Sequence, residues 1–297
     1  MKNNSEKLLL IISIIFIILG VGIFLYPSIS NYLAEKNHID IIRNYDDLIV
    51  KIDEEKINEE KEKAKIYNEN LSGDPVHDPF VIGSGYALPE NYKEVLNIAG
   101  DSVMGYVEIP KISVYLPIYH GTSDEVLEKG VGHIQNTSVP IGGKSTHSVL
   151  TGHTGLPNAE LFTRLDELGI GDIFYIHVLD DVLTYKVFET KVILPDKIDE
   201  LQILNGKDYI TLVTCTPYGV NSHRLLVKAE RVEYEEYSVT KSTTDEDGTD
   251  TKKESPSKHY YLTGTQIGIV LLVLILTIVS IIGISIRRKK NLYRIKK

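Results

Sequence analysis

The sequence predicts a mostly β domain, a barrel or a sandwich, placed between two membrane-spanning helices. Between Val103 and Arg231 the chain contains seven short runs rich in Val, Ile, Tyr and Thr, and Gly, Pro, Asn or Asp interrupts them at intervals. This pattern is typical of consecutive short strands. In addition, a long uncharged apolar run lies near each end of the chain.

The first apolar run, Leu8–Leu25, is 18 residues long. At about 1.5 Å of rise per residue, such a helix nearly crosses a hydrocarbon core about 30 Å thick. We therefore expect a cytoplasmic N-terminus and a transmembrane anchor over residues 1–29. A cleaved signal peptide is the alternative, because basic residues precede the run. The run is long for a signal peptide, and Tyr26 and Pro27 follow it in place of a small-residue cleavage site, which favours an uncleaved anchor.

The second apolar run, Ile267–Ile286, is 20 residues long and precedes a strongly basic tail. Seven of the last eleven residues are Lys or Arg, and by the positive-inside rule such a tail remains in the cytoplasm. We expect a transmembrane helix over 263–286 and a cytoplasmic tail over 287–297. Both termini are then cytoplasmic, the central region is extracellular, and the protein contacts membrane lipid through two anchors.

The region between the anchors divides by composition. Residues 30–70 are rich in Glu, Lys, Asp and Ile and predict a charged, solvated helical stalk. Residues 71–100 begin with several Gly and Pro and predict a loop that leads into the β domain. The strand-like runs occupy 101–236, and the Ser-, Thr-, Asp- and Lys-rich residues 237–262 predict a flexible linker to the second anchor.

The individual β elements follow from the runs themselves. The predicted strands are Gly105–Ile109, Ser113–Ile118, Ser148–Leu150, Ile173–Val178, Leu183–Val187, Tyr209–Val213 and Arg224–Val227. Short helices are expected over Asp124–Lys129 and Ala159–Leu168.

The charge distribution argues against a nucleic-acid partner. The net charge is −9, and without the basic C-terminal tail the rest of the chain is more acidic still. A phosphate-binding surface requires a basic patch, and the tail is explained more simply as a topology signal that contacts anionic lipid.

Cys215 is the single cysteine of the chain, so an internal disulfide is impossible. It ends a predicted strand, and Thr216–Gly219, a strong turn signal, follows at once. A lone cysteine is most simply a small buried hydrophobic residue. A reactive thiol is the alternative, and a position at the mouth of a strand suits it.

Two residues are candidate partners of that thiol. Arg224 opens the next predicted strand, so a turn can return it beside Cys215, where a guanidinium favours the thiolate and stabilises an oxyanion. His153 directly follows an apolar strand, in a loop with Gly152 and Gly155, and is placed to accept or donate a proton. A solvated or salt-bridged arginine is the simpler interpretation of Arg224.

Other histidines compete with His153. The rivals in the β region are His120, His133, His147, His177 and His223. Of these, His223 is the most serious, because it adjoins Arg224. One cysteine with scattered histidines lacks the ligand spacing of a zinc site, so we expect no metal.

The motifs around these residues resemble those of the sortases, the cysteine transpeptidases of Gram-positive surfaces. Thr211-Leu-Val-Thr-Cys215 followed by Arg224 matches the TLxTC…R signature, and Leu150-Thr-Gly-His153 matches the histidine motif. The stretch from Val107 to Val232 is similar to sortases throughout. The resemblance implies a closed eight-stranded β-barrel with short helices, with Cys215, His153 and Arg224 as the catalytic residues. Thr214 is expected to support them.

Two features resemble class C, the sortases that polymerise pilins: the pair of membrane anchors and the tripeptide Asp78-Pro79-Phe80. The tripeptide is similar to the class C lid, in which Asp78 pairs with Arg224 and Phe80 covers the Cys215 sulfur. A plain turn is the alternative for these residues. The sequence departs from many class C members at Thr154, where an arginine is expected.

The resemblance implies a reaction that requires no cofactor. The enzyme cleaves an LPxTG-like sorting signal between Thr and Gly through a thioester on Cys215. It then transfers the acyl group to a lysine amine of a pilin subunit. A housekeeping sortase that anchors surface proteins to peptidoglycan is the alternative enzyme. A non-catalytic assembly scaffold is the alternative of another class, and the intact Cys, His and Arg argue against it.

Overall fold

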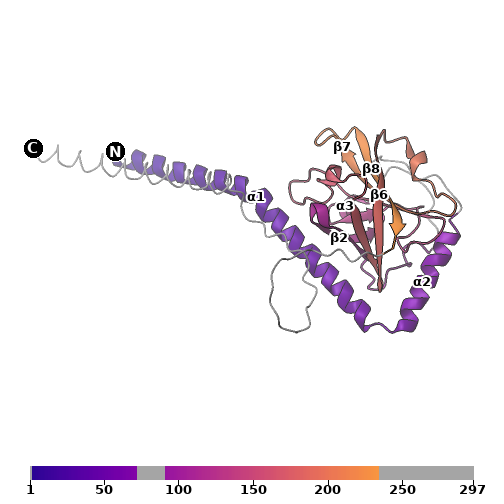
Figure 1. Cartoon of the computed structure of the whole chain (residues 1–297). Coiled ribbons are helices and arrows are strands. Elements are labelled where there is room, and N and C mark those ends of the chain that lie inside the picture. The colour runs from indigo at the N-terminus through magenta and orange to yellow at the C-terminus, as the bar shows by residue number, and fades with distance from the viewer. Residues whose placement is uncertain (1, 72–90, 234–297) are drawn as a thin grey trace, which may run out of the picture. The chain divides into compact units, whose positions relative to one another are not determined.

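The computed structural model describes residues 2–71 and 91–233 of the 297-residue chain (Figure 1). The described elements are α1 (Lys2–Lys51), α2 (Glu54–Glu69), β1 (Val103–Ile109), β2 (Val114–His120), α3 (Asp124–Leu127), β3 (Val131–His133), β4 (Thr146–Thr151), β5 (Ile173–Val178), β6 (Asp181–Ile193), β7 (Asp208–Thr216) and β8 (His223–Val232). Three short 3-10 helices lie at η1 (Pro110–Ile112), η2 (Leu165–Glu167) and η3 (Ile198–Leu201). The predicted linker, second transmembrane helix and basic tail lie outside the described residues.

The eight strands close into a barrel in the order β1-β2-β3-β4-β7-β8-β6-β5, which confirms the expected architecture. β2 pairs with β3 and β4 pairs with β7 in parallel, whereas all other neighbours are antiparallel. Parallel neighbours require a long crossover between them. The β4–β7 pairing therefore brings together residues that are far apart in the sequence.

Two local predictions differ from the structure. The apolar runs located seven of the strands but missed β3, because Val-Gly-His is too short and too mixed to stand out from a loop. The helix expected over Ala159–Leu168 is wrong: the chain forms turns there, with η2 at its end. Its apolar side chains, among them Phe162, are buried in the main core, so their spacing reflects burial and not a helical repeat.

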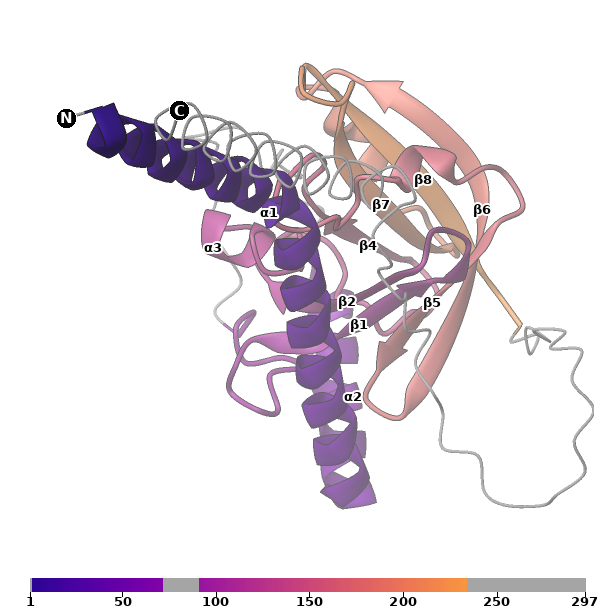
Figure 2. The ribbon, with the colours of Figure 1, turned by 90° about the vertical axis from the view of Figure 1, so that its left-hand side faces the viewer.

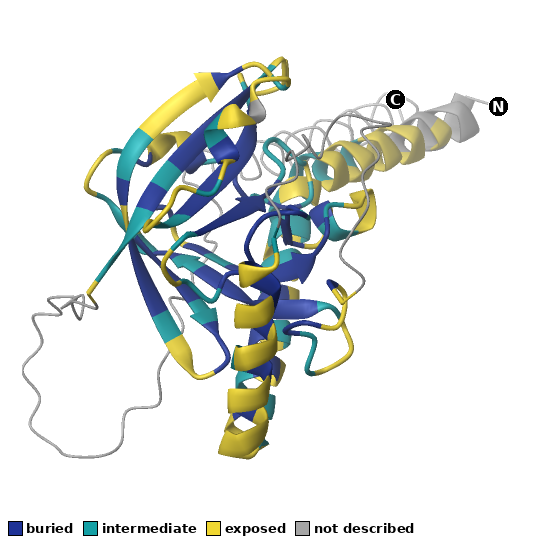
Figure 3. Ribbon diagram, turned by 90° about the vertical axis from the view of Figure 1, so that its right-hand side faces the viewer, coloured by how far each residue is buried: buried dark blue, intermediate teal, exposed yellow. Residues whose placement is uncertain are grey.

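The barrel interior contains alternate side chains of each strand, as expected for a period of two. Val107, Ile118, Ile176 and Leu212 are completely buried, and Figure 3 shows the strands largely in the colour of buried residues. On the other face of the sheet, the strand residues Val149, Ile193, Val213 and Leu226 form a second, smaller apolar cluster. Ile134, just after β3, and Leu201 of η3 complete it.

α1 and α2 are fastened to the barrel by buried hydrogen bonds. Tyr45 Oη of α1 donates to the Met104 carbonyl (3.2 Å) and accepts from the Leu179 amide (2.8 Å). Asn68 of α2 donates through Nδ2 to the Val139 carbonyl (3.2 Å) and accepts through Oδ1 from the Val139 amide (2.8 Å). These side chains satisfy backbone groups of the barrel that would otherwise be buried without partners.

The segment 30–70, expected to be a solvated stalk, is helical but not fully solvated. Ile42, Ile57, Ala64 and Tyr67 are buried and belong to the main core. A helix needs an apolar stripe on one face alone to pack in this way. The many charged residues on the remaining faces explain why composition suggested full solvation.

The N-terminal part of α1, up to Tyr32, forms a unit separate from the residues that follow it. Its apolar side chains are exposed, for example Phe16 and Ile23. An 18-residue window within Ile11–Lys51 has a mean hydropathy of 2.4, and this is the one helix among the described residues that is long and apolar enough to cross a membrane. This agrees with the first of the two predicted anchors.

Candidate active site

Cys215 and Arg224 are directly opposite each other on neighbouring antiparallel strands. Cys215 lies near the end of β7, Arg224 lies near the start of β8, and the register pairs them. Opposed residues project from the same face of a sheet, so the thiol and the guanidinium are neighbours. Ile193, the last residue of β6, pairs with Arg224 on its other side. Figure 2 shows β6, β8 and β7 side by side.

The loop that follows Cys215 holds the Arg224 guanidinium in place. Arg224 Nη1 donates to the carbonyl oxygens of Asn221 and His223, at 3.1 Å each. The Pro217 carbonyl accepts from the Asn221 amide at 3.0 Å, which closes the loop on itself. The guanidinium is thus fixed by backbone groups next to the thiol, and both residues are largely buried, with 6% of Arg224 and 8% of Cys215 exposed.

His153 lies at the same level of the sheet as Cys215. It follows β4, whose last residue, Thr151, pairs in parallel with Val213 of β7. The Gly152 amide continues this pairing by donating to the Val213 carbonyl at 3.1 Å. His153 lies two residues after Thr151, and Cys215 lies two residues after Val213. The parallel register therefore brings the two sequence motifs together.

Two contacts hold the loop that carries His153. Thr214 Oγ1 donates to the Gly152 carbonyl at 2.7 Å, which ties the strand of the thiol to the loop of the histidine. On the other side, a Cβ added at Gly152 would lie 2.9 Å from Cδ2 of the buried Phe162 ring. The Phe162 amide donates to the His153 carbonyl at 3.1 Å. Glycine is therefore required before the histidine because the ring approaches the backbone so closely.

The loops after β4 and after β7 pack against each other. Gly155 has a φ of +76°, and a Cβ there would lie 3.0 Å from Cε2 of Tyr218. Tyr218 belongs to the loop after Cys215 and remains 69% exposed. The site is thus bounded by two loops that contact each other, one that follows β4 and one that follows β7.

Burial and nearby charge act in opposite directions on the pKa of His153. Burial lowers its pKa from 6.5, while the carboxylates of Asp124 and Glu128, on and just after α3, raise it. A neutral imidazole accepts a proton from a thiol, and the imidazolium so formed donates it to a leaving amine. The sequence analysis missed both acidic residues, because the β3–β4 pairing that brings α3 near His153 includes the strand that was not predicted.

The five rival histidines have other partners. Their ring nitrogens contact Val95 O and Ser102 O (His120), Tyr92 Oη and Ser138 O (His133), Gln202 O and Thr211 Oγ1 (His147), Glu108 Oε2 (His177) and Ser222 Oγ (His223). His223 is the neighbour of Arg224 along β8, and strand alternation directs its side chain to the opposite face. Among the predicted candidates, the geometry therefore favours His153.

The remaining predictions about the site concern a lid and metal ions. Asp78, Pro79 and Phe80 lie outside the described residues. Within 2–71 and 91–233, no group of three or more His, Cys, Asp or Glu side chains is arranged to hold a metal ion.

Comparison with known proteins identifies the fold. Residues 107–232 match the family model of the sortase domain. Among solved structures, Streptococcus pneumoniae sortase C is 41% identical, with 66% of this chain and 97% of that chain covered and a TM-score of 0.61. Sortase C-1 of Actinomyces oris is 48% identical, with coverages of 61% and 99% and a TM-score of 0.58. Sortase C1 of the group B Streptococcus pilus island 1 is 42% identical, with coverages of 69% and 96% and a TM-score of 0.62.

Curated relatives with lower sequence identity are also sortases. Sortase D of Bacillus subtilis is 33% identical over 131 residues, which are 43% of this chain and 63% of that relative's length. Sortase A of Bacillus anthracis is 26% identical over 231 residues, covering 77% of this chain and 97% of the relative. Fold, strand order, and the matches to sortase structures above 40% identity lead to one conclusion: the chain belongs to the sortase family of cysteine transpeptidases, and its structural neighbours are sortases of class C.

Proposed function

We propose that this protein is a membrane-anchored transpeptidase that joins pilin subunits. The observation that carries the proposal is the pairing of Cys215 with Arg224, at the level of His153. The class C neighbours support it further, since one is described in connection with pilin substrate specificity and another belongs to a pilus island.

The first half-reaction forms a thioester on Cys215. His153 takes the thiol proton, and the thiolate attacks the threonine carbonyl of an LPxTG-like sorting signal. Arg224 stabilises the oxyanion that develops on the carbonyl oxygen. The bond between the carbonyl carbon and the glycine nitrogen then breaks, and the His153 imidazolium donates its proton to the departing amine.

The second half-reaction transfers the acyl group. A lysine amine of another pilin subunit attacks the thioester carbonyl, the carbon–sulfur bond breaks, and an isopeptide bond forms. His153 receives the proton of the attacking amine, and the Cys215 sulfur leaves as the thiolate. The buried site suits this chemistry because fixed donors act more strongly where water is excluded.

The orientation in the membrane is part of the proposal. The first anchor lies in α1, which is long and apolar enough to span a bilayer. With the second apolar run, Ile267–Ile286, and the basic residues behind it, the barrel faces the cell exterior and both termini face the cytoplasm. This arrangement places the enzyme where surface proteins emerge with their sorting signals.

Co-expression with a candidate pilin tests the acceptor. The wild-type enzyme is expected to produce covalent ladders whose isopeptide crosslinks are identified by mass spectrometry, and Cys215→Ala is expected to produce none. Ladders that persist with Cys215→Ala contradict the nucleophile. Single surface proteins attached to cell-wall peptide, without ladders, would instead identify a housekeeping sortase.

We also propose that Asp78, Pro79 and Phe80 act as a lid over the thiol. A carboxylate neutralises a guanidinium, an aromatic edge packs well against sulfur, and proline fixes the bend between them. Asp78→Ala and Phe80→Ala are expected to raise the rate at which a thiol reagent labels Cys215. An unchanged labelling rate contradicts the lid.

A further inference from the structure

The connection between β6 and β7, residues 194–207, runs the full length of the sheet. It leaves β6 after Ile193, which is paired with Arg224. It enters β7 at Asp208, which is paired with Thr146 at the far end of the sheet. We call these residues the strap, since the chain must travel from the thiol end of the sheet to the opposite end.

The strap lies on the same face of the sheet as the thiol. Side chains two residues apart on a strand share a face. This face carries Cys215, Val213 and Thr211 of β7 and their partners Arg224, Leu226 and Lys228 of β8. Leu201 of the strap is buried in one apolar cluster with Val213 and Leu226. The strap therefore packs directly beside the Cys215–Arg224 pair.

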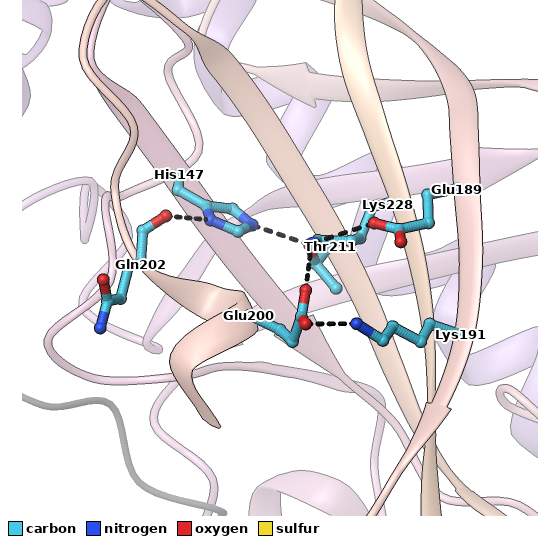
Figure 4. A network of polar contacts seen from close by, with 7 residues as sticks. All are labelled: His147, Glu189, Lys191, Glu200, Gln202, Thr211 and Lys228. Atoms are coloured by element: carbon cyan, nitrogen blue, oxygen red, sulfur yellow. Dashed lines mark hydrogen bonds and ion pairs between the residues drawn. The ribbon is translucent and has the colours of Figure 1, made fainter. Parts of the chain in front are cut away.

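Glu200 anchors the strap through two lysines. Its carboxylate lies 2.8 Å from Lys228 Nζ and also contacts Lys191 Nζ (Figure 4). Lys228 is held in turn by Glu189 at 3.1 Å. Because the Lys228 side chain is only 12% exposed and that of Glu200 29%, solvent screens these pairs less than it screens pairs on an open surface.

A second anchor follows two residues later, on the same face of the sheet, at β4 and β7. The Gln202 carbonyl lies 2.9 Å from His147 Nδ1, and His147 Nε2 lies 2.7 Å from Thr211 Oγ1 (Figure 4). Lys191 and Lys228 lower the pKa of the Glu200 carboxyl to about 2. Burial lowers the pKa of His147 to about 4. At neutral pH the strap is thus held by an ionised carboxylate at Glu200 and by a neutral imidazole at Gln202.

One part of the strap bridges the active site and these anchors. The turn Leu194–Lys197 begins beside Arg224 and ends where η3 begins, and the Lys197 amide donates to the Leu194 carbonyl at 3.0 Å. Leu194 is 48% exposed. Ile193 and Arg224 share one row with the thiol, so this turn borders the β6 side of the candidate site.

We propose that Glu200 is a positioning residue that holds the turn Leu194–Lys197 as a preformed wall for the acyl-donor peptide, an inference that rests on the proposed transpeptidase function. Without its carboxylate, the strap loses both lysine contacts and is held only at Leu201 and Gln202, so the turn that precedes them becomes more mobile. A mobile wall must be ordered when the peptide binds, which weakens binding. The chemical step is unaffected, because Cys215, His153 and Arg224 lie outside the strap.

The test compares Glu200→Gln with a matched control, Lys61→Met. Lys61 of α2 forms two ion pairs of 2.6 Å with Asp180 and Asp181 at the other end of β6, so the control also removes two ion pairs. With a fluorescent sorting peptide, Glu200→Gln is expected to raise KM about fivefold to tenfold and to change kcat less than about twofold. The labelling rate of Cys215 by a thiol reagent should remain that of the wild type. Lys61→Met should leave both kinetic constants unchanged.

Hydrogen exchange of the intact proteins gives a readout that is independent of catalysis. Residues 194–207 are expected to exchange about fivefold faster or more in Glu200→Gln, and at the wild-type rate in Lys61→Met. Wild-type exchange in Glu200→Gln, or a loss confined to kcat, overturns the positioning role. If the wild-type enzyme forms no thioester with any sorting peptide, the proposed function fails, and the exchange result then shows separately whether Glu200 holds the strap.

Discussion

Thr214 links the two motifs of the candidate site through one short hydrogen bond, from its Oγ1 to the Gly152 carbonyl. Thr214→Val keeps the shape of the side chain and removes the donor. We expect kcat/KM for a sorting peptide to fall about tenfold, because the His153 loop loses its fixed distance from Cys215. The unfolding free energy should decrease by about 1–2 kcal/mol, measured by urea denaturation.

A control for Thr214→Val is the same substitution at Thr184 of β6. Thr184 Oγ1 is buried and has no hydrogen-bond partner among the described residues. Thr184→Val should therefore leave activity unchanged and stability unchanged or higher. Equal activities of the two variants would show that the Thr214 bond does not position the histidine.

Asp124 is expected to tune the pH dependence of the reaction. Its carboxylate raises the pKa of His153, against the lowering effect of burial. Asp124→Asn removes that charge, so the imidazolium becomes less stable and its pKa falls further. The limb of the kcat/KM profile that reports His153 should move to lower pH, by about 0.3 unit because α3 is exposed. Glu125→Gln on the same helix is the control, and an equal shift there contradicts a specific effect.

At the scale of single elements, the attachment of α2 to the barrel depends on Asn68. This side chain forms two hydrogen bonds with Val139, in the way that a neighbouring strand would. Asn68→Ala leaves a buried amide and a buried carbonyl without partners, and we expect the unfolding free energy to fall by about 2–3 kcal/mol. Asn70→Ala, at the exposed C-cap of the same helix, should change it by less than about 0.5 kcal/mol. Comparable losses would show that α2 is not docked through Asn68.

The strands and the site residues were predictable for different reasons. Val, Ile and Tyr runs located most strands because strand burial leaves a period of two in the sequence. The sortase motifs singled out Cys215, His153 and Arg224, and the structure brings Cys215 and Arg224 into one pair. The helix expected over Ala159–Leu168 failed because apolar spacing in a packed loop mimics a helical stripe.

The strap could not be predicted, because its contacts depend on register. Glu200 of η3 contacts Lys228 of β8, 28 residues further along the chain, and no local sequence pattern predicts that contact. His147 was considered in the sequence as a rival catalytic residue; the structure shows it bonded to Thr211 and the Gln202 carbonyl. Such contacts follow from strand order, and strand order was available only through the family resemblance.

For the whole molecule, buried histidines predict a loss of stability in mild acid. Burial lowers the pKa of His133 to about 3 and that of His147 to about 4. Between those values and 6.5 the unfolded chain binds protons that the folded chain does not, so lowering the pH favours unfolding. From pH 6.5 to pH 5 the expected loss is about 2 kcal/mol for each histidine.

Urea denaturation at pH 7 and pH 5 measures this dependence. His147→Gln retains a side chain that can hydrogen-bond to Thr211 but cannot titrate, so its stability should depend less on pH than that of the wild type. Equal stability of the wild-type protein at both pH values would contradict the prediction.

The pairing of β7 with both β4 and β8 also has a consequence for biosynthesis. The barrel closes only after its last two strands have been made, and those strands supply Cys215 and Arg224. A chain that stops before β8 has an open sheet edge and no guanidinium beside its thiol. The Cys215–Arg224 pair therefore forms only when the last strand of the barrel is in place, so the proposed nucleophile and its guanidinium come together only in the completed fold.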